Sequence, residues 1–200
     1  MAGELETEVG RLEEQLKVAR EAGDLEMEAC AVHDTGALHL EREPSKAEPF
    51  LQRALELFER AGLKDGHAYS LLNLAIVRES QGDLGEARRL LEDAMTLVSQ
   101  DGLESVKTHA IAQQGRLELA EGNLGKARNL FILALERTEQ TGDRPLAEVM
   151  PSLVSCYRQL GELSEARVVL ECHLAALLRE GFFPFAVQAH ELLTDILEEE

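Results

Sequence analysis

Residues able to bind metals or act as nucleophiles are few in this chain and stand apart. His33 and His39 are six residues apart, a spacing that separates two side chains widely around a helix, and the adjacent Cys172 and His173 likewise point apart. The sequence holds no HExxH motif, no Cys/His pair at zinc spacing and no glycine-rich phosphate loop after a strand. Its many carboxylate pairs are typical of solvated helix faces. We therefore expect no metal, no cofactor and no enzymatic activity.

Three cysteines, Cys30, Cys156 and Cys172, are odd in number, far apart and without a CxxC pair. We expect them to be buried, reduced thiols, which suit a cytoplasmic protein. The N-terminus is acidic and lacks an apolar segment, so we expect no signal peptide.

Glycine recurs at near-constant spacing in this chain, and its positions predict the helices that carry the polar side chains. Members of one series are separated by 39, 40, 40 and 39 residues, and a second series falls midway between them. Glycine ends helices by taking the left-handed conformation, so this double series predicts a helical repeat protein. The two series are Gly23, Gly62, Gly102, Gly142 and Gly181, and Gly82, Gly122 and Gly161, with Arg42 where the first unit lacks a midway glycine.

Each unit contains two stretches with apolar residues at helical spacing, joined by a short step such as Gly82-Asp83. In that step a C-terminal glycine precedes a residue that can cap the next helix. Each unit is therefore predicted to be a helix, a tight turn and an antiparallel helix. The predicted organisation is a capping helix at 1–23, repeats at 24–62, 63–102, 103–142 and 143–181, and a capping helix at 182–200, about ten helices in a single all-α domain.

Alanines fix how these helices pack. One position of the second helices holds alanine in all four units, and the position seven residues later holds alanine in three, with His173 in the fourth. A bulkier apolar residue lies between them. Alanine lets two helices approach closely. The three series are Ala47, Ala87, Ala127 and Ala166; Ala54, Ala94, Ala134 and His173; and Leu51, Leu91, Phe131 and Leu170.

Two prolines interrupt this pattern. Pro49 is expected to mark a late start of the second helix of the first unit. Pro151 either kinks the first helix of the fourth unit, by removing an i→i−4 hydrogen bond, or lies where that helix starts. A kink would adjust the curvature of the array or shape a pocket.

The pattern over residues 26 to 181 resembles the tetratricopeptide repeat family. Near the centre of the first helix that family carries a small residue, here Ala75 and Gly115, with Thr35 and Val154 as larger substitutes. The period of 39–40 residues exceeds the commoner period of about 34 and is similar to that of a long-helix subset found in scaffolds, kinesin light chains and bacterial regulators. The resemblance implies a right-handed α-α superhelix whose concave face is lined by the first helices.

This resemblance also maps residues onto the concave face. One equivalent position reads His33, Asn73, Gln113 and Ser152, all with side chains able to pair with a peptide backbone. The expected peptide-binding residues are His33, Tyr69, Asn73, Ile76, His109, Gln113, Arg116, Ser152, Ser155 and Arg158, and the same mapping includes Val32, Gly36, Leu72, Glu79, Leu119 and Glu148.

Charge narrows the range of partners. A formal net charge of −18 argues against nucleic acid and anionic membranes, and no apolar stretch approaches the ~18 residues needed for a membrane span. We expect a scaffold or adaptor that is a monomer or weak homo-oligomer and binds a protein or peptide partner. Two alternatives are a regulatory subunit whose ligand changes the shape of the superhelix, and a structural homo-oligomer formed through Phe182, Phe183 and Phe185.

Overall fold

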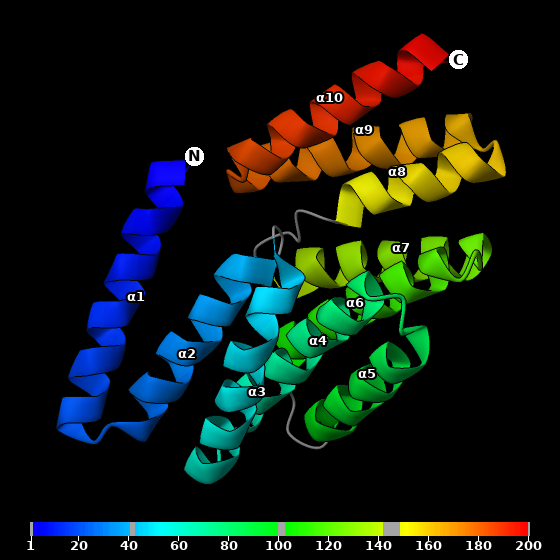
Figure 1. Ribbon diagram of the computed structural model, residues 1–200. Helices are drawn as coiled ribbons and strands as arrows, with labels where there is room; N and C mark the ends of the chain where they lie inside the picture. Colours follow the sequence, from blue (N-terminus) through cyan, green and yellow to red (C-terminus); the bar gives the residue numbers. More distant parts are fainter. Residues whose placement is uncertain (1, 41–42, 100–102, 142–148, 200) are drawn as a thin grey trace. The chain divides into compact units, whose positions relative to one another are not determined.

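The computed structural model describes the backbone of residues 2–40, 43–99, 103–141 and 149–199. Across these residues it contains ten α-helices and no strand, and it confirms the all-α class (Figure 1). Arg42, Gly102, Gly142 and Glu148 lie outside the described residues. The helices are α1 (Ala2–Ala22), α2 (Leu25–Leu40), α3 (Pro44–Ala61), α4 (Lys64–Ser80), α5 (Leu84–Ser99), α6 (Glu104–Ala120), α7 (Leu124–Thr141), α8 (Val149–Leu160), α9 (Leu163–Glu180) and α10 (Phe183–Glu199).

Six glycines of the two series end helices in the left-handed conformation. Their φ angles lie between 68° and 82°, and no other described residue type takes a positive φ. At Gly62 the N–H donates to Glu59 O at 3.1 Å, and the N–H of Leu63 donates to Phe58 O at 3.0 Å. This pair of bonds is a Schellman motif, which satisfies the last carbonyls of α3. The glycines therefore end these helices by taking the left-handed conformation, as their spacing in the sequence predicts.

The chain forms two compact units, residues 1–110 and 111–200, which divide within α6. In the first unit, consecutive helices from α1 to α5 pack against each other, and α2 also contacts α4 (Figure 1). The first helices α2 and α4 are thus direct neighbours. Within the second unit α7 packs on α8, and α9 packs on both α8 and α10.

Close helix packing centres on the residues that the alanine pattern singled out. All members of the three series are buried, His173 included. A Cβ added at Gly36 would lie 2.9 Å from Leu51 Cδ2, so Gly36 is the small residue of α2 that faces the second helix. The sequence assigned this place to Thr35. Thr35 is instead buried one residue away, where its hydroxyl donates to Ala31 O at 2.8 Å.

Two further expectations need correction. α3 begins at Pro44 and contains Pro49, because Pro44 occupies the first helical position, where its missing N–H leaves no hydrogen bond unmade. Of the cysteines, Cys156 is buried, whereas Cys30 and Cys172 are exposed. Burial raises the pKa of the Cys156 thiol. All three are free thiols.

Pro151 is the third residue of α8. The first turn of a helix has no i→i−4 partners for its N–H groups, so proline there costs no hydrogen bond. Residues 142–148, just before α8, lie outside the described residues, so the choice between a kink and a helix start at Pro151 stays a prediction. Across the described residues, no helix combines the length and apolar content needed to cross a membrane.

Candidate peptide-binding surface

Neighbouring first helices of the first unit are joined by a polar contact. Asn73 of α4 places Nδ2 3.1 Å from Nε2 of His33 on α2. His33 Nδ1 lies 3.2 Å from Asp34 Oδ1. An amide nitrogen can only donate and a carboxylate can only accept, so His33 carries its proton on Nδ1 and accepts at Nε2. Asp34 therefore selects the tautomer of His33 that holds the Asn73 amide.

One turn earlier on α4, Tyr69 makes the corresponding contact with α6. Its hydroxyl lies 3.1 Å from Ser105 Oγ, and its ring meets the His109 ring edge to face, with centroids 5.3 Å apart. His109 Nδ1 donates to Ser105 O at 3.0 Å. The ring of His109 is thereby fixed against Tyr69. We call the half-exposed group formed by His33, Asp34, Tyr69, Asn73, Ser105 and His109 the α4 polar strip.

Asn73 retains hydrogen-bonding capacity within this strip. Among the described residues, none donates a hydrogen bond to Asn73 Oδ1. Its Nδ2 carries a second N–H besides the one directed at His33. An asparagine amide that presents one acceptor and one donor matches a peptide unit of an extended chain. Ile76 is half-buried one turn further on.

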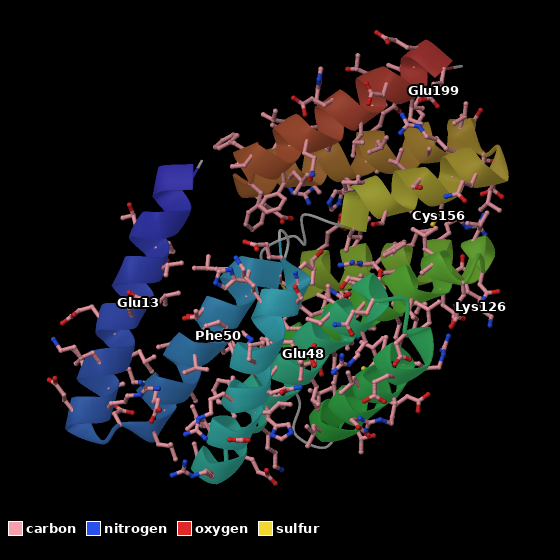
Figure 2. All side chains as sticks on the ribbon, viewed as in Figure 1. Glu13, Glu48, Phe50, Lys126, Cys156 and Glu199 are labelled. Atoms are coloured by element: carbon pink, nitrogen blue, oxygen red, sulfur yellow. The ribbon has the colours of Figure 1, made fainter. Side chains whose placement is uncertain are left out.

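Five of the predicted peptide-binding residues lie in the second compact unit, residues 111–200. Gln113 is only 6% exposed. Arg116, Ser152 and Ser155 are half-buried, and Arg158 is exposed. Arg158 is already engaged: its Nε donates to Glu199 Oε2 at 3.0 Å, and Glu199 projects from the last turn of α10 (Figure 2). Ser155 Oγ accepts from Gln159 Nε2 at 3.1 Å.

Three residues mapped onto the concave face belong to the helix packing instead. Val32, Gly36 and Leu72 are buried, because the apolar stripe of each first helix faces the neighbouring second helices. They therefore line no surface.

Sequence reasoning missed two members of the α4 polar strip. Ser105 stands one turn before His109, and Asp34 follows His33 directly. Both are local partners of a predicted site residue, so a search for polar residues at i±1 and i±4 of each site residue could have found them. The described residues contain no group of three or more His, Cys, Asp and Glu side chains arranged to hold a metal ion.

Comparison with known proteins gives the family. Residues 36–100 match the family model of the tetratricopeptide repeat. Residues 36–100 of this chain are therefore a tetratricopeptide repeat region. Such repeats indicate a protein–protein interaction scaffold, and the family is generally non-catalytic. No curated protein is similar enough in sequence to count as a relative.

Solved structures share the fold of this chain at low sequence identity. BtubC from P. vanneervenii is 17% identical, with a TM-score of 0.66 over 98% of this chain and 91% of its own. A Rap protein complexed with Competence and Sporulation Factor is 15% identical, with a TM-score of 0.60 over 96% of this chain and 58% of its own. A Podosopora anserina protein, described as a kinesin light chain with nearly identical TPR-like repeats, is 16% identical, with a TM-score of 0.60 over 84% of both chains.

Proposed function

We propose that this protein is a scaffold that binds an extended peptide segment of a partner protein across the α4 polar strip. The observation that carries the proposal is the Asn73 amide. His33 holds it from one side, while its Oδ1 accepts no hydrogen bond from a described residue. A peptide backbone beside α4 could donate to Oδ1 and accept from the second N–H of Nδ2.

Pre-organisation supports this role. His33 is fixed by Asp34 and by an edge-to-face contact with Phe58, with centroids 6.1 Å apart. Tyr69 is fixed by Ser105 and His109. Side chains that are ordered before binding lose little conformational entropy when a ligand arrives, so the peptide bears most of that cost.

The same role is proposed for Arg116, Ser152, Ser155 and Arg158 of the second unit, whereas Gln113 is buried and could meet a peptide only if its side chain turned outward. Arg158 would exchange Glu199 for an acidic group of the peptide, because a guanidinium binds any carboxylate in the same two-pronged way. The net charge of −18 disfavours nucleic acid as a partner. A cytoplasmic location completes the proposal, because exposed thiols at Cys30 and Cys172 suit a reducing compartment.

The test replaces Asn73 by alanine. Peptides that bind the wild-type protein are first selected from a random display library. They are then labelled, and their affinity for each protein variant is measured by fluorescence anisotropy. Loss of two hydrogen bonds to the backbone predicts that Asn73→Ala weakens binding by about tenfold. Because the contact is to backbone, the loss should be similar for peptides of different sequence.

Asn129→Ala is the matched control, since Asn129 is an exposed asparagine on the second helix α7. It should change affinity less than twofold. Circular dichroism of both variants checks that the helices remain intact. Unchanged affinity in a folded Asn73→Ala protein would show that the peptide binds elsewhere.

A regulatory role is the second candidate, favoured by the shared fold with a Rap protein solved in complex with a named factor. In that case ligand binding would alter the shape of the molecule. X-ray scattering with and without a selected peptide distinguishes the two roles: an unchanged radius of gyration indicates a passive scaffold, and a change of several ångströms indicates a regulatory module.

A further inference from the structure

The outward face of α10 carries exposed apolar residues in a stripe that has the spacing of a helix–helix seam. Phe183, Val187 and Leu197 are 63%, 59% and 52% exposed. With His190 and Thr194 between them, the stripe advances by four, three, four and three residues, the alternation by which one helix presents a continuous face to another. The opposite face of α10 is occupied, because Ala189 and Ile196 are buried in the core of the second unit.

This stripe continues into a groove against α9. Leu174 and Leu178 of α9, together with Phe183, Ala186, Val187 and His190 of α10, line an open groove of about 420 Å³. Leu178 is itself half-exposed. α9 and α10 lie side by side along the groove (Figure 1). A third helix laid along it would therefore contact both.

The charged residues that α10 contributes are all acidic. α10 contains Glu191, Asp195, Glu198 and Glu199 and no lysine or arginine. Asp195 and Glu199 face Arg158. Glu191 and Glu198 stand seven residues apart, so they share one flank of the stripe, and Glu191 also lines the groove.

We propose that this α9–α10 groove docks an amphipathic helix of a partner protein, one with an apolar seam and basic residues along its flank. The apolar seam would cover Val187 and its neighbours, and lysine or arginine would meet Glu191 and Glu198. A second copy of this chain fits poorly, because pairing α10 with itself would set acidic flanks against each other with no cation from either helix.

The size of the partner segment follows from the stripe. Phe183 to Leu197 covers 14 residue steps, or about 21 Å at 1.5 Å per residue. A partner helix of about four turns would cover it. This docking surface shares no residue with the α4 polar strip, so the two proposals can fail independently.

The test uses synthetic peptides of known chemistry and the full chain. The probe is an 18-residue helix with leucine at the seam and lysine along its flank; a scrambled peptide of the same composition has no seam. We expect the probe to bind at least tenfold more tightly than the scrambled peptide in fluorescence anisotropy at physiological salt. Equal binding of both peptides would show non-specific attraction to an acidic protein and would overturn the proposal.

Two variants locate the site. Val187→Glu should weaken binding of the probe at least tenfold, whereas the matched control Val168→Glu should change it less than twofold. Val168 is an equally exposed valine, 54% exposed, on α9, and it does not line the groove. Because both valines are exposed, both variants should keep the wild-type circular dichroism. No difference between the two variants would overturn the proposal.

A charge swap tests the chemistry of the flank. Replacing Glu191 and Glu198 by lysine should weaken binding of the lysine probe at least fivefold and strengthen binding of a probe with glutamate in place of lysine. If both probes respond alike, the basic flank is wrong. Light scattering measures the oligomeric state of the wild type and of Val187→Glu. A wild-type dimer that this substitution converts to a monomer would show that a second copy of the chain occupies the groove, and would overturn the proposal.

Discussion

Gly115 shows how tightly single residues are constrained in this fold. A Cβ at this position of α6 would lie 2.8 Å from Cε1 of Phe131, a fully buried ring on α7. The ring has no free space to move into, so Gly115→Ala should overpack the interface at a cost of about 1–3 kcal/mol. The better helix propensity of alanine returns about 1 kcal/mol. We therefore expect a net loss of about 1 kcal/mol in the free energy of unfolding, measured by urea denaturation.

Gly125→Ala is the control for this substitution at the residue scale. Gly125 lies at the start of α7, with a negative φ and no atom within 4 Å of an added Cβ. It gains propensity without a clash, so this variant should be as stable as the wild type or more stable. If the two variants behave alike, the approach of α6 to α7 is looser than described.

At the scale of elements, α3 and α4 are joined by the ion pair between Glu48 and Arg78. Arg78 Nη2 lies 2.5 Å from Glu48 Oε1, both side chains are about three-quarters buried, and Gln81 Nε2 donates to Glu48 Oε2 at 3.2 Å (Figure 2 labels Glu48 on α3). The Arg78 hydrogen bond, followed by that of Gln81, holds the pKa of Glu48 below its ordinary value of 4.5. Arg78 interrupts the apolar stripe of α4 at the place where this pair forms.

This lowered pKa predicts a dependence of stability on pH. A carboxyl group whose folded-state pKa is depressed contributes stability above its unfolded pKa, and that contribution is lost as the pH falls from about 4.5 through the folded pKa. Glu48→Gln should therefore destabilise the protein by about 1 kcal/mol at pH 7 and by less at pH 3. Urea midpoints at both pH values measure the difference.

Glu56→Gln on the same helix is the control, because the Glu56–Arg53 pair is exposed and one turn apart. Exposed pairs of this kind contribute little to stability. An equal effect of both substitutions at pH 7 would show that the α3–α4 pair has no special role.

For the whole molecule, the sequence predicts the repeating parts best. Across the described residues, helix ends and helix contacts recur from repeat to repeat, so glycine and alanine at constant spacing predict the helices and the buried series. Contacts made once are harder to predict. The pair of Arg158 with Glu199 depends on how α10 lies against α8, and the burial of Val32 and Leu72 depends on which face of each first helix meets its neighbours. The start of α3 was predicted near Pro49 because proline is common in the first turn of a helix. Pro44 already occupies that place, and Pro49 lies inside the helix.

Net charge is a property of the whole molecule and gives the last prediction. With 38 acidic and 20 basic residues, the chain has a charge of −18, so long-range repulsion opposes the folded state. The Debye length falls from about 30 Å at 0.01 M salt to about 8 Å at 0.15 M, which removes most of that repulsion. Exposed one-turn pairs such as Arg89–Glu86 are also screened, but each contributes little. Repulsion should therefore dominate, and the melting temperature should rise by several degrees between these two concentrations of sodium chloride.

Thermal melts followed by circular dichroism measure this rise. Potassium chloride at equal ionic strength should give the same result, because screening depends on ionic strength and not on the cation. Replacing Glu191 and Glu198 together by glutamine lowers the net charge to −16 and should reduce the slope of melting temperature against salt. A melting temperature that falls as salt is added would mean that the ion pairs outweigh the repulsion, and the acidic surface would then be a source of stability in this protein.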